Sequence, residues 1–191
     1  MNEISDYING LFNKYQKPYL LYHNLEHTQY VVKKSEEIAQ HYLLGQEDFF
    51  ILATAAWFHD TGQLFSYGKG HEEKSVAIMK EYFSKRNIQT EIINNIETCI
   101  MATKIPHRPI SFLQEIICDA DTYNLGTKHF FKTDNWLRQE CELKESTKIY
   151  DWNKSTLKFL EHHQYFTSYC QNQLNKGKEK NIQIIRSKIK G

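Results

Sequence analysis

Residues 51–60 read Ile-Leu-Ala-Thr-Ala-Ala-Trp-Phe-His-Asp, and the interpretation of the whole chain begins with this stretch. It is apolar on every side for two helical turns, which is typical of a helix in the centre of a globular core. It ends in His59 and Asp60, whose burial is unfavourable unless they are paired or bound to a cation. The stretch therefore predicts a buried helix that carries two metal-type ligands into the interior.

The composition fits one globular domain over residues 1–191. Of the 191 residues, 40% are apolar and 25% are charged, and the net charge is +1. This length and composition are sufficient for a sizeable core. A charge near zero gives no support for a large nucleic-acid footprint. No apolar run reaches the roughly 18 residues of a membrane span, so we expect no membrane partner.

Four cysteines are scattered along the chain, and no two of them form a Cys-x-x-Cys pair. This spacing favours neither a zinc ribbon nor a disulfide framework. Reduced thiols are the better interpretation, and they predict a cytoplasmic protein. The cysteines are Cys99, Cys118, Cys141 and Cys170.

Apolar residues recur at helical spacing along most of the chain, and alternating strand patterns are nearly absent. The sequence therefore predicts an all-α, single-domain helical bundle. Its motifs lie within about residues 22–140, and C-terminal helices occupy 150–190. The expected helices cover residues 4–15, 24–45, 46–59, 71–85, 88–103, 112–123, 152–170 and 176–190, and residues 128–143 are mixed polar and aromatic.

The ends of three predicted helices carry the candidate metal ligands. Asn24 is a plausible N-cap, which places His27 in the first turn of a helix. In an antiparallel hairpin, the start of one helix lies beside the end of its partner, so His27 meets His59 and Asp60. Asp121, at the end of a later helix, would close the set.

Two imidazoles and two carboxylates form a mixed nitrogen and oxygen site for one divalent ion. The absence of thiolates disfavours a structural zinc. The sequence does not distinguish among manganese, iron, cobalt, nickel, zinc and magnesium. Each residue alone has an ordinary explanation: a core histidine, a turn-forming Asp60, a salt-bridged Asp121. Their joint occurrence at helix ends favours the metal site.

The order of these ligands resembles the HD-domain superfamily of metal-dependent phosphohydrolases, in particular its small stand-alone bacterial members. The matching motifs are Tyr-His-Asn-x-x-His at 22–27, Ala-x-Phe-His-Asp at 56–60 and Asp-Ala-Asp at 119–121. Two further segments match, His71-Glu72-Glu73-Lys74-Ser75 and Thr103-Lys104. The resemblance spans Tyr22 to about Glu140.

This resemblance implies that His27, His59, Asp60 and Asp121 are the metal ligands. It implies that Asp119 is a neighbour that orients a ligand or a water molecule. Some branches carry a catalytic Glu four residues after the His of the His-Asp pair, but Gln63 stands there in this chain. Since Gln cannot take a proton, the proton-handling role shifts to His71 or Glu72.

Three basic residues follow an apolar helix and could bind phosphate. We expect Lys104 to offset charge in catalysis and His107 and Arg108 to bind substrate, although a solvated loop explains them equally well. Two-metal branches of the superfamily add histidines in this interval. His71 and His107 therefore leave room for a second ion.

Three functions remain open at this point. The first is a metal-dependent phosphohydrolase, a phosphomonoesterase or phosphodiesterase, acting on a small phosphorylated compound such as a nucleotide. The second is an HD-fold di-iron oxygenase, in which His71 and His107 would both bind iron. The third is a non-catalytic nucleotide-binding domain, which Gln63 in place of a carboxylate keeps open. The sequence indicates neither the substrate nor the oligomeric state.

Overall fold

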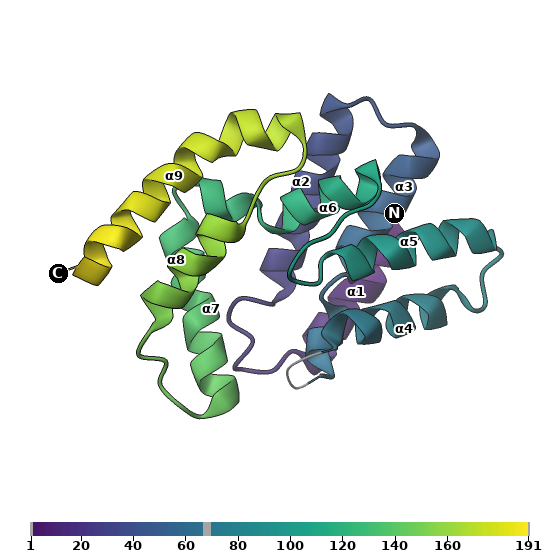
Figure 1. Ribbon diagram of the computed structural model, residues 1–191. Helices are drawn as coiled ribbons and strands as arrows, with labels where there is room; N and C mark the ends of the chain where they lie inside the picture. Colours follow the sequence, from purple (N-terminus) through teal and green to yellow (C-terminus); the bar gives the residue numbers. More distant parts are fainter. Residues whose placement is uncertain (1, 67–69, 191) are drawn as a thin grey trace.

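The computed structural model describes residues 2–66 and 70–190, and within them it contains helices and no strand. The predicted all-α fold is confirmed. In Figure 1, α7, α8 and α9 form one side of the molecule and α1, α3, α4 and α5 the other, with α2 and α6 between them. The elements are α1 (Asn2–Tyr15), α2 (Leu25–His41), α3 (Gln46–Phe58), the 3-10 helix η1 (Thr61–Leu64), α4 (His71–Phe83), α5 (Thr90–Ala102), α6 (Phe112–Asp121), the 3-10 helix η2 (Tyr123–Gly126), α7 (Phe130–Glu145), α8 (Trp152–His162) and α9 (Ser168–Lys190).

Helix α3 is the centre of the core, as residues 51–60 predict. It packs against α1, α2, α4, α5 and α6. Side chains on all its faces are buried, including Ile51, Ala53, Ala55 and Phe58. A helix covered on every side has no room for a solvated polar residue, so its apolar run ends only where His59 begins.

The hairpin of α2 and α3 forms as expected. The Asn24 side chain caps α2 by accepting a hydrogen bond from the His27 backbone N–H at 3.0 Å. Leu43 adopts a positive φ of 53°, which turns the chain between the two helices. The helices pack against each other, and the first turn of α2 therefore lies beside the last turn of α3.

The prediction of one continuous helix over residues 152–170 is wrong. Helix α8 ends at His162, and α9 begins at Ser168. The buried carboxylate of Asp119 accepts hydrogen bonds from the backbone N–H groups of Phe166 and Thr167, both at 2.8 Å, and from Thr167 Oγ1 at 2.7 Å. These bonds hold the backbone between the two helices in a non-helical conformation. The expected stripe at 176–190 is thus the second half of α9.

Helix α9 packs directly on η2, the turn that follows α6. A Cβ added at Gly177 would lie 1.9 Å from the carbonyl oxygen of Gly126, and one added at Gly126 would lie 2.5 Å from that of Leu174. Only glycine permits such a backbone approach. The C-terminal helix is therefore fixed against the segment that follows Asp121.

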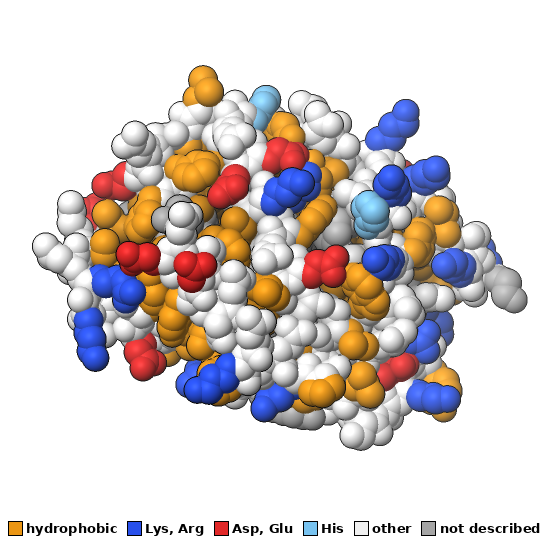
Figure 2. All heavy atoms as spheres, turned by 180° about the vertical axis from the view of Figure 1, so that it is seen from behind, with side chains coloured by type: hydrophobic (Ala, Val, Ile, Leu, Met, Phe, Trp, Pro, Cys, Tyr) orange, Lys and Arg blue, Asp and Glu red, His pale blue; other side chains and the backbone are white. Residues whose placement is uncertain are grey.

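Acidic and basic side chains both occur on the face shown in Figure 2, in keeping with the net charge of +1. In the ranges that the structure covers, no helix is both long and apolar enough to cross a membrane. The four cysteines are free, and Cys141 alone among them is not fully buried.

Candidate metal centre

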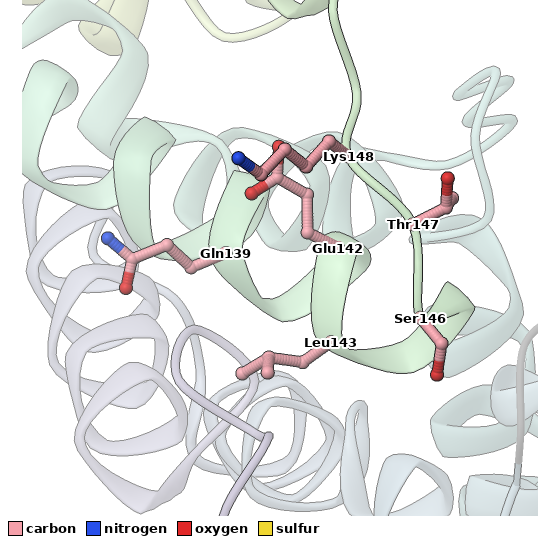
Figure 3. A pocket seen from close by; sticks show the side chains of 6 residues that line it. All are labelled: Gln139, Glu142, Leu143, Ser146, Thr147 and Lys148. Carbon is pink, nitrogen blue, oxygen red and sulfur yellow. The ribbon is translucent and has the colours of Figure 1, made fainter.

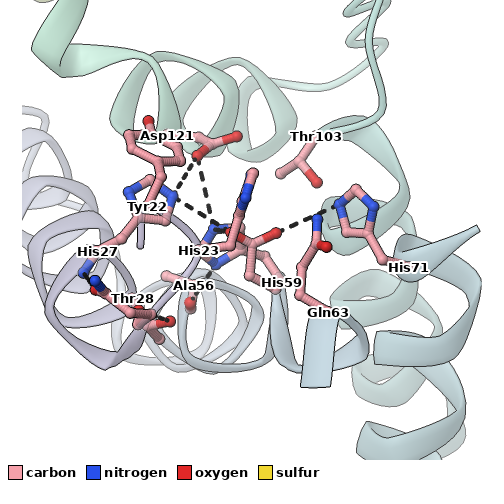
Figure 4. Close-up of polar contacts among 12 residues, drawn as sticks. Tyr22, His23, His27, Thr28, Ala56, His59, Gln63, His71, Thr103 and Asp121 are labelled. Atoms are coloured by element: carbon pink, nitrogen blue, oxygen red, sulfur yellow. Dashed lines mark hydrogen bonds and ion pairs between the residues drawn. The ribbon is translucent and has the colours of Figure 1, made fainter. Parts of the chain in front are cut away.

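Four helix ends bring the predicted ligands together. His27 lies in the first turn of α2, His59 caps the end of α3, Asp60 precedes η1, and Asp121 is the last residue of α6. Figure 4 shows the side chains of His27, His59 and Asp121 turned toward one another. The side chains of His59 and Asp60 are almost fully buried, and that of Asp121 is 19% exposed.

The distances define a common point between the four side chains. His27 Nε2 lies 3.4 Å from Asp60 Oδ2 and 3.2 Å from Asp121 Oδ1. His59 Nε2 lies 3.2 Å and 3.6 Å from the same two oxygens. The tightest set is His27, His59 and Asp60, whose ligand atoms all lie within 4.8 Å of one another. Asp121 approaches both imidazoles of this set.

The two imidazoles present nitrogens that have no hydrogen-bond partner within the part of the chain that the structure covers. Both Nε2 atoms are buried and face the carboxylate oxygens of Asp60 and Asp121 without a hydrogen bond to them. His59 Nδ1 lies 2.8 Å from the carbonyl oxygen of Ala56, so Nδ1 donates its proton there and Nε2 is the nitrogen left to bind a cation. A hydrogen-bonded Nδ1 and a free Nε2 aimed at two carboxylates are the usual arrangement of a metal-binding histidine. The residues fit a divalent ion.

The electrostatics of the cluster also require positive charge. Burial alone lowers the pKa of His59, but the carboxylates of Asp60 and Asp121 outweigh burial and raise it well above its usual value. Burial opposes the charge of Asp60, yet the neighbouring histidines hold its pKa well below the usual range. A cation at the common point satisfies the same two carboxylates.

Asp60 also faces a third histidine with its other oxygen. His71 Nε2 lies 3.4 Å from Asp60 Oδ1, and His71 Nδ1 lies 3.5 Å from Glu72 Oε2. The start of α4 is held in place because Ser75 Oγ donates to the His59 carbonyl at 2.6 Å and accepts from the Gly62 N–H at 2.8 Å. The structure thus brings His71 and Glu72 to the edge of the ligand cluster.

A comparison of the sequence with models of known protein families identifies the family of this chain. The family model of the HD domain matches residues 24–126, which is more than half of the chain. The chain belongs to the HD domain family. HD domains bind divalent metals, and the family generally consists of metal-dependent hydrolases. No curated protein matches the sequence, and no solved structure matches it either.

The basic residues predicted from the sequence divide into two groups. Lys104 lines the cavity beside the metal centre of the HD domain, but its exposed Nζ pairs with Glu73 at 2.6 Å. His107 Nε2 lies 3.1 Å from the Thr103 carbonyl oxygen, and Arg108 is exposed. Neither His107 nor Arg108 is among the residues that line the cavity.

Asp119 has a structural role that the sequence did not predict. Its two oxygens accept the three hydrogen bonds from residues 166 and 167, so it organises the break between α8 and α9. Orienting a metal ligand or a water molecule stays a prediction for Asp119. The Asp-Ala-Asp motif of this HD domain contains one structural carboxylate and one at the metal centre.

A charged network on α7, beyond the end of the family match, was missed from the sequence. Glu140 Oε1 lies 2.6 Å from His23 Nδ1 and 2.7 Å from Lys144 Nζ, which also donates to Gln63 Oε1 at 3.0 Å. Burial raises the pKa of Glu140, but the contacts from His23 and Lys144 outweigh burial and lower it to about 2. The i,i+4 spacing of Glu140 and Lys144 predicts an ion pair on a helix. The mixed composition of residues 128–143, however, does not indicate that this pair faces the interior.

A cavity of about 860 Å³ opens from the metal centre toward α7 and α8. Its polar end is lined by Tyr22, His23, Asp60, His71 and Asp121, and Lys144 and Gln63 also face it. This volume is within the range of roughly 300–1,000 Å³ typical of small-molecule sites.

A smaller hollow of about 360 Å³ lies at the C-terminal end of α7 (Figure 3). Its carboxylate, Glu142, already accepts hydrogen bonds from Arg138 Nε and the Ile149 N–H, both at 3.0 Å. Ser146 ends the helix there with a positive φ of 52°. This hollow is part of the helix termination and shares no lining residue with the cavity at the metal centre.

Proposed function

We propose that this HD domain is a metal-dependent phosphohydrolase that acts on a small phosphate ester. The observation that carries the proposal is the pair of buried Nε2 atoms of His27 and His59, which face Asp60 and Asp121 and have no hydrogen-bond partner among the described residues. These four residues would hold one divalent ion. The ion would stabilise charge on a phosphoryl oxygen as a Lewis acid and make a water molecule more acidic.

His71 handles the proton in this proposal. It stands beside Asp60 and is oriented by Glu72, which is 6% exposed. The oxygen of the attacking water forms a bond to phosphorus while the ester P–O bond breaks. One proton of the water passes to His71, which then delivers a proton to the leaving oxygen. Gln63 cannot perform this step because its amide does not titrate.

Lys144 offsets the negative charge of the phosphoryl group, a role that the sequence suggested for Lys104. Its Nζ lies at the polar end of the cavity, and its side chain is only 14% exposed. Both ammonium groups already pair with a carboxylate, Lys144 with Glu140 and Lys104 with Glu73, but the side chain of Lys104 is 50% exposed. A partly desolvated ammonium group interacts more strongly with phosphate than a solvated one.

The test is a turnover screen of phosphorylated metabolites, with the chelated protein reloaded separately with manganese, cobalt, nickel or magnesium. We expect phosphate release that depends on the metal and is lost in Asp60→Ala. Asp151→Ala is the matched control, because Asp151 is exposed and its one ion pair within the described ranges is with Lys154. Full activity in Asp60→Ala would remove the site from the mechanism.

The same preparation separates the two rival functions. A di-iron oxygenase would contain two irons per chain in a natively loaded sample, as measured by elemental analysis. The position of His107 gives that function no support, because its Nε2 is directed to the Thr103 carbonyl. Tight nucleotide binding without turnover under every metal would instead favour the non-catalytic domain.

A further inference from the structure

One face of α7 lines the cavity along its whole length. Phe130, Asp134, Leu137, Cys141 and Lys144 follow one another at intervals of three or four residues, and all of them border the same space. This spacing places them in a row on one side of the helix. The bonds of Lys144 to Gln63 and of Glu140 to His23 fix the C-terminal end of this row at the metal centre. The row therefore leads away from the metal toward Phe130.

The far part of the cavity is lined largely by apolar and aromatic side chains. Helix α8 contributes Trp152 and Phe159, α7 contributes Phe130 and Leu137, and η2 contributes Leu125. We call this part, lined by these five residues, the aromatic arm. Aromatic side chains of this kind bind flat apolar rings through stacked and edge contacts.

The aromatic arm contains one carboxylate, that of Asp134. Its Oδ1 accepts hydrogen bonds from Trp152 Nε1 and Thr156 Oγ1, both at 3.0 Å. In the two described ranges, no donor bonds to its Oδ2. Asp134 lies six residues before Glu140, which is about 9 Å along an α-helix. An acceptor thus stands in the arm at a defined distance from the metal end.

We propose that the aromatic arm binds the organic part of the substrate, an aromatic ring that carries an amino or hydroxyl group facing Asp134. The phosphate would lie at the metal centre, so the proposal names the substrate class of the proposed phosphohydrolase and rests on that function. The ring packs against Trp152 and Phe159, and the donor group bonds to Asp134 Oδ2. A small aliphatic phosphate would leave the arm unfilled.

The arm belongs to the part of the chain that the family does not define. The match to the HD domain ends at Gly126, whereas the lining residues on α7 and α8 begin at Phe130. Of the arm residues, only Leu125 lies inside the match. Selectivity for the organic group is therefore encoded in helices that this chain adds to the metal-binding scaffold.

Binding of phosphonates tests the arm without requiring turnover. The probes are 4-(aminomethyl)benzylphosphonate, 4-methylbenzylphosphonate and ethylphosphonate, titrated calorimetrically into the manganese-loaded full chain. We expect the ring to improve affinity at least about tenfold over ethyl, because it buries apolar surface that ethyl leaves in water. The amino group should add at least about a further tenfold, the size of one hydrogen bond to a charged acceptor.

Two variants assign these gains to residues. Asp134→Asn should remove the preference for the aminomethyl probe and keep the preference for the ring, whereas Asp151→Asn should change neither. Leu137→Trp should fill the arm, weaken both ring-bearing probes at least about fivefold and leave ethylphosphonate unchanged. A Leu137→Trp protein that binds ethylphosphonate normally is folded at the metal end.

The outcomes separate the arm from the proposed function. Equal affinity for all three phosphonates, no binding of any of them, or an aminomethyl preference that survives Asp134→Asn would overturn the inference. Tight binding of the ring-bearing probes without release of phosphate from the matching benzyl phosphates would leave the arm standing and overturn the hydrolase. Equal kcat/KM for benzyl and ethyl phosphates would overturn the arm and leave the hydrolase standing.

Discussion

The two ends of the cavity are built in different ways. At the metal end, four side chains come from the termini of different helices, and two imidazole nitrogens have no hydrogen-bond partner in the part of the chain that is described. At the other end, consecutive turns of α7 and α8 present an aromatic wall. Helix ends concentrate polar groups at one point, whereas a helix face spreads contacts over a length. The comparison suggests that chemistry belongs to the family-defined half and selectivity to the C-terminal half.

The largest expected effect is the loss of the metal end. His59→Ala should remove the bound ion and lower phosphate release by at least about 1,000-fold, because both metal-assisted effects disappear together. His162→Ala is the matched control, since His162 is exposed and, among residues 2–66 and 70–190, its side chain bonds only to the Lys158 carbonyl. Elemental analysis of both proteins, with rates at saturating metal, makes the measurement. A His59→Ala protein that keeps its metal and its activity would show that the metal end does not carry the chemistry.

The next effect tests whether the C-terminal half also contributes to chemistry. Lys144→Met should lower kcat by about 100-fold, the usual size for one removed electrostatic donor, and leave the metal content unchanged. Lys104→Met should change kcat by less than about threefold, because an exposed pair contributes little. Partial recovery in Lys144→Arg would point to charge rather than packing. Equal losses in the Lys144 and Lys104 variants would contradict this assignment.

A third effect concerns stability alone. Asp119→Ala should lower the free energy of unfolding by about 3 kcal/mol, because it leaves buried donors at the α8–α9 break without an acceptor. Urea unfolding monitored by circular dichroism measures this loss, and the metal content should stay at the wild-type level. Asp151→Ala should lie within about 0.5 kcal/mol of wild type. Loss of the ion without loss of stability would mean that Asp119 supports the metal centre and not the α8–α9 break.

The smallest effect is a pH dependence that joins the two halves. The folded-state pKa of Glu140 is lowered from 4.5 to about 2, so its carboxylate adds stability above about pH 4.5 that is lost as the pH falls toward 2. Between pH 5 and pH 2.5, the free energy of unfolding of Glu140→Gln should therefore fall by about 2 kcal/mol less than that of wild type. Parallel urea titrations at the two pH values give the difference. Identical acid sensitivity in both proteins would mean that the contacts with His23 and Lys144 do not stabilise the ionised carboxylate.

The two halves also differ in how far the sequence predicts them. Residues 51–60 alone indicate a central helix and its terminal ligands, because an apolar run that ends in His-Asp has few stable alternatives. Asn24 and Asp121 follow from capping and from helix-end position. The break at residues 163–167 was not predictable, since it depends on the carboxylate of Asp119, more than 40 positions away in the chain. The inward direction of Lys144 likewise depends on tertiary contacts with Gln63 and Glu140.

The contact between Gly126 and Gly177 links the two halves mechanically. The last helix lies, backbone against backbone, on the turn that begins two residues after Asp121, so it forms part of the support of a ligand that belongs to the family core. A shortened protein that kept every metal-binding side chain but stopped before residue 168 would leave that turn uncovered. We therefore expect a stable form of this protein to need α9, well past the end of the family match at residue 126.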